Sequence, residues 1–134
     1  MDNAYVLDSF ALLAHLENEK RGEKVTEILR RAQQSQNIEL YISVINLGEV
    51  YYITMRERGE QKAEEILELI KLLPIQIIEA GLNATIKASK LKSRYPIAYG
   101  DCFAAALAKS KNIRVMTGDP EFKKLKNKIK IEWL

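Results

Sequence analysis

The sequence predicts an α/β protein in which helices cover both faces of a mostly parallel central sheet of about five strands, giving three layers. Two observations indicate this class. Short apolar runs alternate along the chain with longer segments whose apolar residues recur at helical spacing. Most of the short runs are apolar throughout, as expected for strands buried on both faces. With 134 residues, 47% hydrophobic and 29% charged, the chain is expected to form one domain over residues 1–134.

A short apolar strand, Ala4–Leu7, comes first in the predicted order. A helix follows it, because apolar residues recur at helical spacing as far as Leu16. Ser9 precedes that pattern and is the expected N-cap, since its hydroxyl can accept a free backbone N–H. A second helical pattern begins at Gly22 and leads into the next strand.

The middle of the chain repeats this alternation. The strand Ile38–Ile42 ends at Ser43, which is expected to cap the following helix. That helix reaches about Arg58 and is ended by Gly59. Another helix follows and is closed by Pro74, because proline has no N–H to continue the helical ladder.

The last part of the chain adds three strands and two helices. A strand over Ile75–Ile78 precedes a helix over residues 81–93. Tyr95-Pro96 breaks the chain before an alanine-rich helix over Asp101–Lys111. The final strands are Ile113–Met116 and Ile129–Trp133. Charged residues alternate with apolar ones in the last strand, which favours a position at the edge of the sheet.

Composition excludes several kinds of site. The only cysteine, Cys102, cannot form an internal disulfide or a Cys-rich zinc site, and the only histidine, His15, cannot form a multi-histidine metal centre. No apolar stretch approaches the roughly 20 residues of a membrane helix, and no signal-peptide pattern opens the chain. We therefore expect a cytoplasmic protein without membrane contact, whose site is built mainly from carboxylates, hydroxyls and basic groups.

Charge is unevenly distributed. The formal net charge is +3, yet residues 1–67 hold 8 Lys and Arg against 12 Asp and Glu, whereas residues 68–134 hold 13 against 6. The basic second half indicates a polyanionic partner, unless its helices merely present lysine to solvent. Lys87, Lys90 and Arg94 share one face of a predicted helix and are candidates for binding RNA phosphates.

Four carboxylates lie close to the carboxyl ends of the predicted strands, where sites occur in open α/β sheets. Asp8 follows the first strand, and Glu49 lies in the second turn of the helix after the second strand. Asp101 opens the alanine-rich helix, and Asp119 follows the fourth strand. Capping or turn formation could account for the three aspartates one by one. Neither accounts for Glu49 within a helix, so we expect the four to form one site.

Carboxylates gathered within a few ångströms of one another repel, and a cation relieves that repulsion. A site of oxygen ligands without histidine or cysteine selects Mg²⁺ or Mn²⁺. Such a site can hold one ion or two, about 3.5–4 Å apart. The spacing of the acids leaves the number of ions open.

The segments around these acids resemble PIN-domain ribonucleases, and specifically the VapC-type toxins of toxin–antitoxin pairs. The resemblance extends over residues 6–122, in order and spacing, and rests on four motifs. They are Val6-Leu7-Asp8-Ser9, Ser43 with Glu49, the run from Asp101 to Ala108, and Thr117-Gly118-Asp119-Pro120-Glu121-Phe122.

The resemblance implies a PIN-like fold and a Mg²⁺- or Mn²⁺-dependent endoribonuclease. It also implies a homodimer that is inhibited by a small VapB-type antitoxin. At the positions that match the family's motifs, the resemblance implies that the four acids are catalytic, with Asp8 and Asp101 as metal ligands and Glu49 and Asp119 as possible further ligands. Thr117 matches a family hydroxyl that could orient Asp119 or a water.

Several alternatives stay open at this point. Ser9 could support the acids in the same way as the hydroxyl near the fourth strand, or act only as a helix cap. The chain could be a PIN-domain RNA-processing nuclease that is not a toxin. It could also be a non-catalytic module whose acidic pocket binds an arginine of a partner. The RNA target, the antitoxin and the dimer interface are not specified by the sequence.

Overall fold

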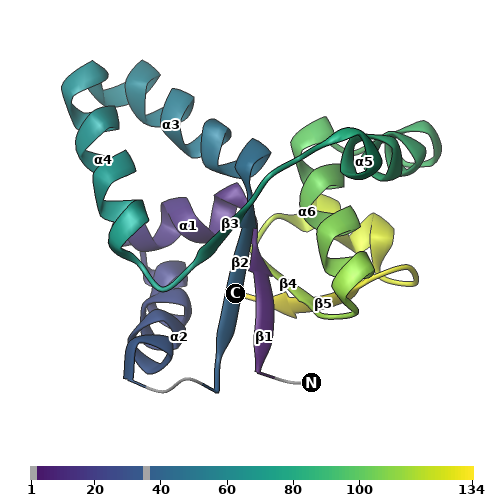
Figure 1. Ribbon diagram of the computed structural model, residues 1–134, viewed down its shortest axis with the longest axis horizontal. Coiled ribbons are helices and arrows are strands. Elements are labelled where there is room, and N and C mark those ends of the chain that lie inside the picture. Colours follow the sequence, from purple (N-terminus) through teal and green to yellow (C-terminus); the bar gives the residue numbers. More distant parts are fainter. Residues whose placement is uncertain (1–2, 35–36) are drawn as a thin grey trace.

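The computed structural model describes residues 3–34 and 37–134. Five strands in this part of the chain form one sheet in the order β3-β2-β1-β4-β5, and every neighbouring pair is parallel (Figure 1). The strands are β1 (Ala4–Leu7), β2 (Glu39–Ser43), β3 (Gln76–Ile78), β4 (Arg114–Thr117) and β5 (Lys130–Trp133). The predicted five-stranded parallel sheet is confirmed, as is the edge position of the last strand.

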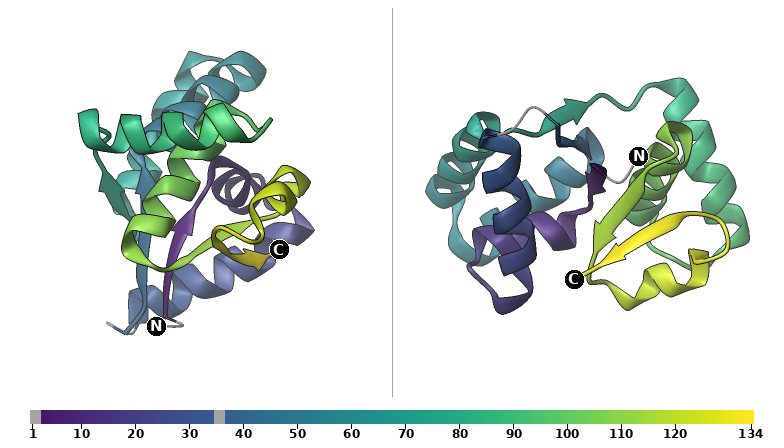
Figure 2. Two further views of the ribbon diagram at one scale, coloured as in Figure 1. Left: turned by 90° about the vertical axis from the view of Figure 1, so that its right-hand side faces the viewer. Right: turned by 90° about the horizontal axis from the view of Figure 1, so that it is seen from below.

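Helices cover both faces of the sheet, which confirms the predicted α/β/α layers. Figures 1 and 2 show one group of helices on each side. One face carries α1 (Ser9–Leu16), α2 (Glu23–Gln34), α3 (Val44–Arg58) and α4 (Glu60–Leu72). The other carries α5 (Leu82–Arg94), α6 (Tyr99–Lys111) and the 3-10 helix η2 (Pro120–Leu125), and a second 3-10 helix, η1 (Lys20–Gly22), precedes α2. None of the helices in the described residues is long and apolar enough to cross a membrane.

Alternation along the strands divides the core between these two faces. Val6 and Val115 pack into a cluster formed largely by α6 and η2. Their neighbours Leu7 and Met116 point the other way and pack against α1 and α2. Because β1 and β4 pair in the register Leu7–Met116, the next residues along both strands, Asp8 and Thr117, come side by side at the carboxyl end of the sheet.

Two predicted helix starts are corrected by the structure. Ser9 is not the cap of α1: Asp8 is the N-cap, and its Oδ1 accepts the Ala11 N–H at 2.8 Å. The reason is that β1 ends at Leu7, so Asp8 is the one residue with the extended backbone that a cap requires. The alanine-rich helix begins at Tyr99, so Asp101 lies within its first turn.

Other predicted boundaries are confirmed. Ser43 caps α3 by accepting the Ile45 N–H, and Gly59, with a φ of 92°, ends that helix. A positive φ is adopted readily by glycine, which has no Cβ to clash with the backbone.

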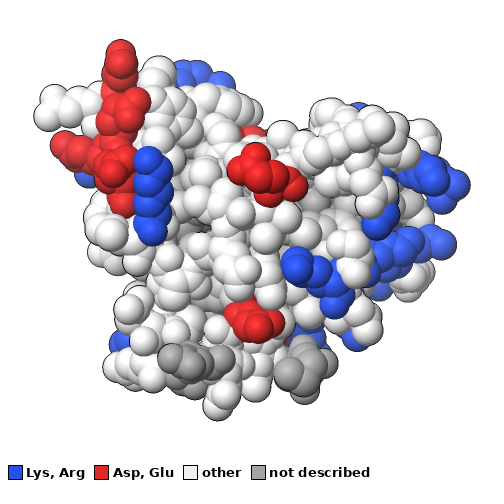
Figure 3. Space-filling view, viewed as in Figure 1, with Lys and Arg blue, Asp and Glu red and all other residues white. Residues whose placement is uncertain are grey.

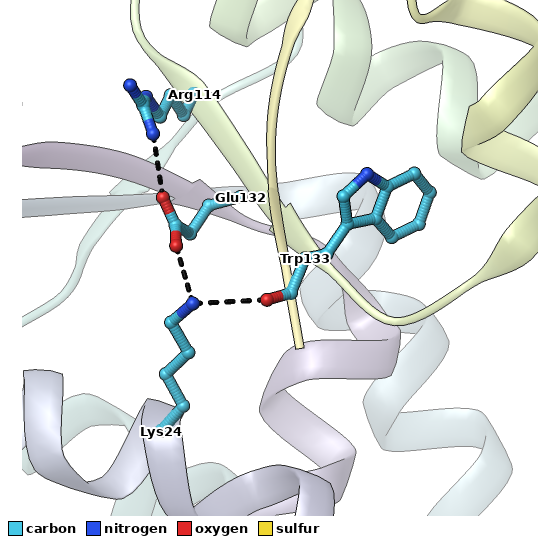
Figure 4. Close-up of polar contacts among 4 residues, drawn as sticks. All are labelled: Lys24, Arg114, Glu132 and Trp133. Atoms are coloured by element: carbon cyan, nitrogen blue, oxygen red, sulfur yellow. Dashed lines mark hydrogen bonds and ion pairs between the residues drawn. The ribbon is translucent and has the colours of Figure 1, made fainter.

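Besides its backbone pairing with β4, the edge strand β5 is held by the side-chain contacts of one carboxylate. Glu132 accepts from Arg114 of β4 at 2.9 Å and from Lys24 of α2 at 2.5 Å, and Lys24 also donates to the Trp133 carbonyl at 3.1 Å (Figure 4). The bond from Lys24 contributes most to lowering the pKa of Glu132 below its usual range. The Leu134 N–H donates to the Thr117 carbonyl at 3.0 Å, so this edge also supports the end of β4.

Candidate active site

Asp8 lies at the carboxyl end of the parallel sheet, between the end of β1 and the start of α1. Its side chain is almost fully buried, with 1% of the residue exposed. Besides capping α1, it accepts a hydrogen bond from the Thr117 hydroxyl, with 2.5 Å between Thr117 Oγ1 and Asp8 Oδ2. The Thr117 oxygen in turn accepts the Asp119 N–H at 3.0 Å. Thr117 therefore connects the first acid of the sequence motifs to the backbone of the last.

Asp101 projects from the first turn of α6 and is 7% exposed. Within the described residues, its carboxylate makes no hydrogen bond or ion pair. Burial raises its pKa to about 7, with further increases from the negative charges of Asp119, Glu49 and Glu121. A buried carboxylate without a cation beside it holds its proton more tightly than a solvated one.

The pKa of Asp8 is also raised to about 7. Burial is the largest cause, and the hydrogen bonds from Thr117 and Ala11 act in the opposite direction. The charges of Asp101 and Asp119 add smaller increases. These effects show that Asp8, Asp101 and Asp119 lie within electrostatic range of one another.

Glu49 enters the site from α3 and is held by a side chain that the motifs did not single out. Asn46, one turn earlier on the same helix, donates from Nδ2 to Glu49 Oε1 at 2.8 Å and to the Gly100 carbonyl at 3.0 Å. Asn46 is fully buried. Its position three residues before a glutamate is the only sequence signal that could have marked it, because the Gly100 contact is long-range.

Asp119 lies on the turn between β4 and η2. Its Oδ1 accepts the Glu121 N–H at 2.9 Å, so it caps η2. The turn is supported from the other side, where Arg21 donates to the Gly118 carbonyl at 3.2 Å and lies over the Phe10 ring. Asp119 thus combines the expected turn role with a place in the acidic cluster.

Glu121 is a further acid of this cluster that sequence reasoning did not select. Its charge contributes to the raised pKa of Asp101, and its carboxylate pairs with Lys124 at 3.2 Å. Cys102, which follows Asp101 in the chain, is buried in the core, and burial raises the pKa of its thiol. A thiol in that state is a poor nucleophile.

The donor chemistry of the site fits a hard divalent cation. In the residues that the structure describes, no three His, Cys, Asp or Glu side chains stand in positions that would hold a metal ion. The available donors are carboxylate oxygens, and burial, followed by like charge, raises the pKa of both Asp8 and Asp101. A cation with oxygen ligands, such as Mg²⁺ or Mn²⁺, would relieve that repulsion.

Within the described residues, no hydrogen bond or ion pair joins the side chains of the other candidate residues to the four acids. Ser9 is partly buried in the first turn of α1. Lys87, Lys90 and Arg94 of α5 line a groove of about 340 Å³ together with Lys109 of α6, and none of the four acids lines it. Figure 3 shows basic side chains gathered over the part of the molecule that holds α5 and α6, and acidic ones over α4.

Comparisons with known proteins agree with the fold described above. A family model described as "PIN domain" matches residues 5–128. No curated protein sequence matches the chain.

Solved structures similar to the chain include DNA-bound VapBC from Salmonella typhimurium, with a TM-score of 0.76, 20% identity and 98% of each chain covered. VapBC2 from Rickettsia felis, bound to a fragment of promoter DNA, has a TM-score of 0.75, 20% identity and the same coverage. A sarcin-ricin loop cleaving toxin, VapC20 from Mycobacterium tuberculosis, has a TM-score of 0.68 and 16% identity, with 90% of this chain and 92% of that chain covered. At these identities the similarities establish the fold.

Proposed function

Because the chain belongs to the PIN-domain family, whose model matches residues 5–128, we propose that it is a Mg²⁺- or Mn²⁺-dependent endoribonuclease and the toxin of a type II toxin–antitoxin pair. The observation that carries the proposal is the proximity of two buried carboxylates from distant parts of the chain. Burial raises the pKa of both Asp8 and Asp101, and the charge of Asp101 raises that of Asp8 further. Perturbed carboxylates at the carboxyl end of a parallel sheet are typical of a catalytic site.

Asp8 and Asp101 would hold the ion, with Glu49 and Asp119 as possible further ligands. A bound divalent ion neutralises phosphodiester charge, lowers the pKa of water and stabilises a leaving 3′ oxygen. The chain's own part is orientation, since the Thr117 hydroxyl fixes one oxygen of Asp8. Water as the attacking group would break the bond to the 3′ oxygen, leaving a 5′-phosphate and a 3′-hydroxyl.

RNA binding is assigned to the basic groove of α5 and α6. Lys87, Lys90 and Arg94 are joined there by Lys109, and within the described residues none of the four is part of an ion pair. Unpaired cations on two adjacent helices suit a phosphate backbone, which carries a negative charge at each nucleotide.

The toxin assignment draws on the similar structures. Several of them are VapBC complexes, and one is named as a toxin that cleaves the sarcin-ricin loop. By that likeness, a VapB-type antitoxin is the proposed partner, and a homodimer in the cytoplasm is the proposed state of the toxin. A PIN-domain RNA-processing nuclease would cleave RNA in vitro without arresting growth, so expression in a host cell distinguishes the two.

The decisive experiment incubates purified protein with structured RNA and Mg²⁺ or Mn²⁺. We expect cleavage to stop with EDTA and to fall at least about 100-fold in D8N and D101N, which keep side-chain size but remove the charge. Glu57→Gln, an exposed acid on the helix that carries Glu49, is the matched control and should cleave normally. Cleavage that persists in EDTA, or in the double variant D8N/D101N, would refute the proposal. If calorimetry shows that the protein binds no divalent ion, a non-catalytic module is favoured instead.

A further inference from the structure

The best-defined polar contact that none of the motifs explains is the amide of Asn46. This side chain has no solvent exposure. Its Nδ2 bridges two acceptors, Glu49 Oε1 at 2.8 Å and the Gly100 carbonyl at 3.0 Å. One amide group thus links a candidate catalytic carboxylate on α3 to the backbone immediately before Asp101 on α6.

Gly100 provides the second half of this arrangement. A Cβ built at Gly100 would lie 2.1 Å from Glu49 Oε2 and 2.5 Å from its Cδ. The Glu49 carboxylate therefore occupies the space that any other side chain at position 100 would need. Glycine is required here by close packing, since its backbone conformation is one that other residues adopt.

The position of Glu49 also matches the charge of the helix that it contacts. The N-cap of α6, Ala98, has no side chain that could accept a backbone N–H. The first turn of a helix carries a partial positive charge, and a carboxylate near it is favourable. Glu49 packs at that turn, beside Gly100, and its charge contributes to the raised pKa of Asp101.

The orientation of the amide leaves one of its own atoms without a partner. Asn46 Oδ1 is buried and, in the described part of the chain, has no hydrogen-bond partner. Turning the amide over would place Oδ1 against a carboxylate and a carbonyl, so both donor contacts require the present orientation. A buried acceptor left unpaired destabilises a fold, so this amide costs stability while its two donor contacts orient Glu49 and α6.

We propose that Asn46 and Gly100 are positioning residues that hold the Glu49 carboxylate against the first turn of α6, the turn that carries Asp101, so that Glu49 is available to a divalent ion there. The inference rests on the proposed function. In this proposal Asn46 acts through Glu49, which accepts from its Nδ2, and is not itself a ligand of the ion. Groups that orient a metal ligand commonly change metal affinity by 10- to 100-fold when they are removed.

The test is a double-mutant cycle read out by Mn²⁺ binding in calorimetry, without RNA. We expect Asn46→Ala and Glu49→Gln each to weaken Mn²⁺ binding by about 10-fold, and the double variant to bind no more weakly than Glu49→Gln alone. Thr54→Ala is the matched control, because Thr54 is a buried polar residue on the same helix. It should bind Mn²⁺ like the wild type, even if its melting temperature falls.

Gly100→Ala is a second route to the same effect, since the added methyl group would push Glu49 away from α6. It should also weaken Mn²⁺ binding, with Asn46 intact. In cleavage assays, Asn46→Ala should lower kcat and leave the KM for RNA unchanged, because the basic groove is separate from Asn46.

Three outcomes would overturn the inference. Asn46→Ala could bind Mn²⁺ as tightly as the wild type. The losses of Asn46→Ala and Glu49→Gln could multiply in the double variant, which would mean that Asn46 acts independently of Glu49. If the wild type itself bound no divalent ion, the proposed function would fail first and this inference with it, whereas the first two outcomes leave the proposed function intact.

Discussion

At Asp8 and Asp101, burial dominates the protonation equilibrium. The hydrogen bonds from Thr117 and Ala11 favour the ionised form of Asp8, yet its pKa is raised to about 7 because desolvation is the larger effect. Asp101 reaches about the same value without such bonds. These two carboxylates therefore destabilise the metal-free fold at neutral pH. A cation bound beside them would reverse this effect, because it favours their ionised form.

Replacing Asp101 should stabilise the protein when no divalent ion is present. Its pKa rises from 3.8 in the reference state to about 7 in the fold, so the folded state binds the proton more tightly. This lowers the free energy of unfolding progressively as pH increases from about 4 to about 7. We expect Asp101→Asn to gain about 1–2 kcal/mol at pH 8, allowing for partial relaxation by water, and less at pH 5.

Thermal melts in EDTA at the two pH values measure this difference. A gain of that size corresponds to roughly 3–8 °C in Tm. Glu57→Gln, on an exposed part of α3, should leave Tm unchanged at both values. An Asp101→Asn variant that is less stable than the wild type at pH 8 would show that the carboxylate is stabilised by a contact of its own.

At the scale of elements, the packing of α5 against α6 brings basic residues from two helices into one groove. Lys90 and Arg94 share a face of α5, but Lys109 reaches the groove only because α6 packs beside it. The lysines of α4 are different, since Lys62 and Lys71 pair with glutamates one turn away on the same helix. On the face that Figure 3 shows, basic side chains gather on the side of the molecule that holds α5 and α6.

Charge reversal in this groove should weaken RNA binding. We expect Lys90→Glu combined with Lys109→Glu to reduce affinity by at least about 10-fold in the cleavage-deficient D101N background. The dependence of log K on log salt should become shallower by about one for each phosphate that the groove no longer neutralises. Fluorescence anisotropy with labelled single-stranded RNA measures both quantities. Lys71→Glu on α4 is the control, and an equal effect there would indicate that net charge, rather than the groove, determines binding.

For the molecule as a whole, binding of one ion should couple distant segments of the chain. Asp8 follows β1 and Asp101 lies in the first turn of α6, so an ion shared by them would favour the folded state over the unfolded chain. We expect Mn²⁺ at about 100 times its Kd to add about 2.7 kcal/mol to the free energy of unfolding. Chemical denaturation with and without Mn²⁺ tests this, and D8N/D101N should show no gain.

How far the site could be predicted differs from residue to residue. Asp8 and Asp119 were identifiable because each closely follows an apolar strand, and Glu49 because a carboxylate among apolar helix residues has no capping role. Asn46 was not identifiable, since its partner Gly100 is 54 positions away and no local pattern relates the two. The N-cap of α1 is Asp8 and not the predicted Ser9, because the cap depends on the residue at which β1 ends. Apolar spacing leaves the position of that strand end uncertain by a residue.

The alternation of apolar runs determined the five strands, the helices between them and the three-layer class, because burial of an apolar face depends on periodicity that any window of the chain contains. The sequence also determined which carboxylates stand at strand ends. Only the tertiary structure decided which of them meet. The register of β1 on β4 joins Asp8 to Thr117 across 109 positions, and the contact of α3 with α6 sets Glu49 against Gly100. Such contacts depend on how whole elements pack, and local spacing does not encode that packing.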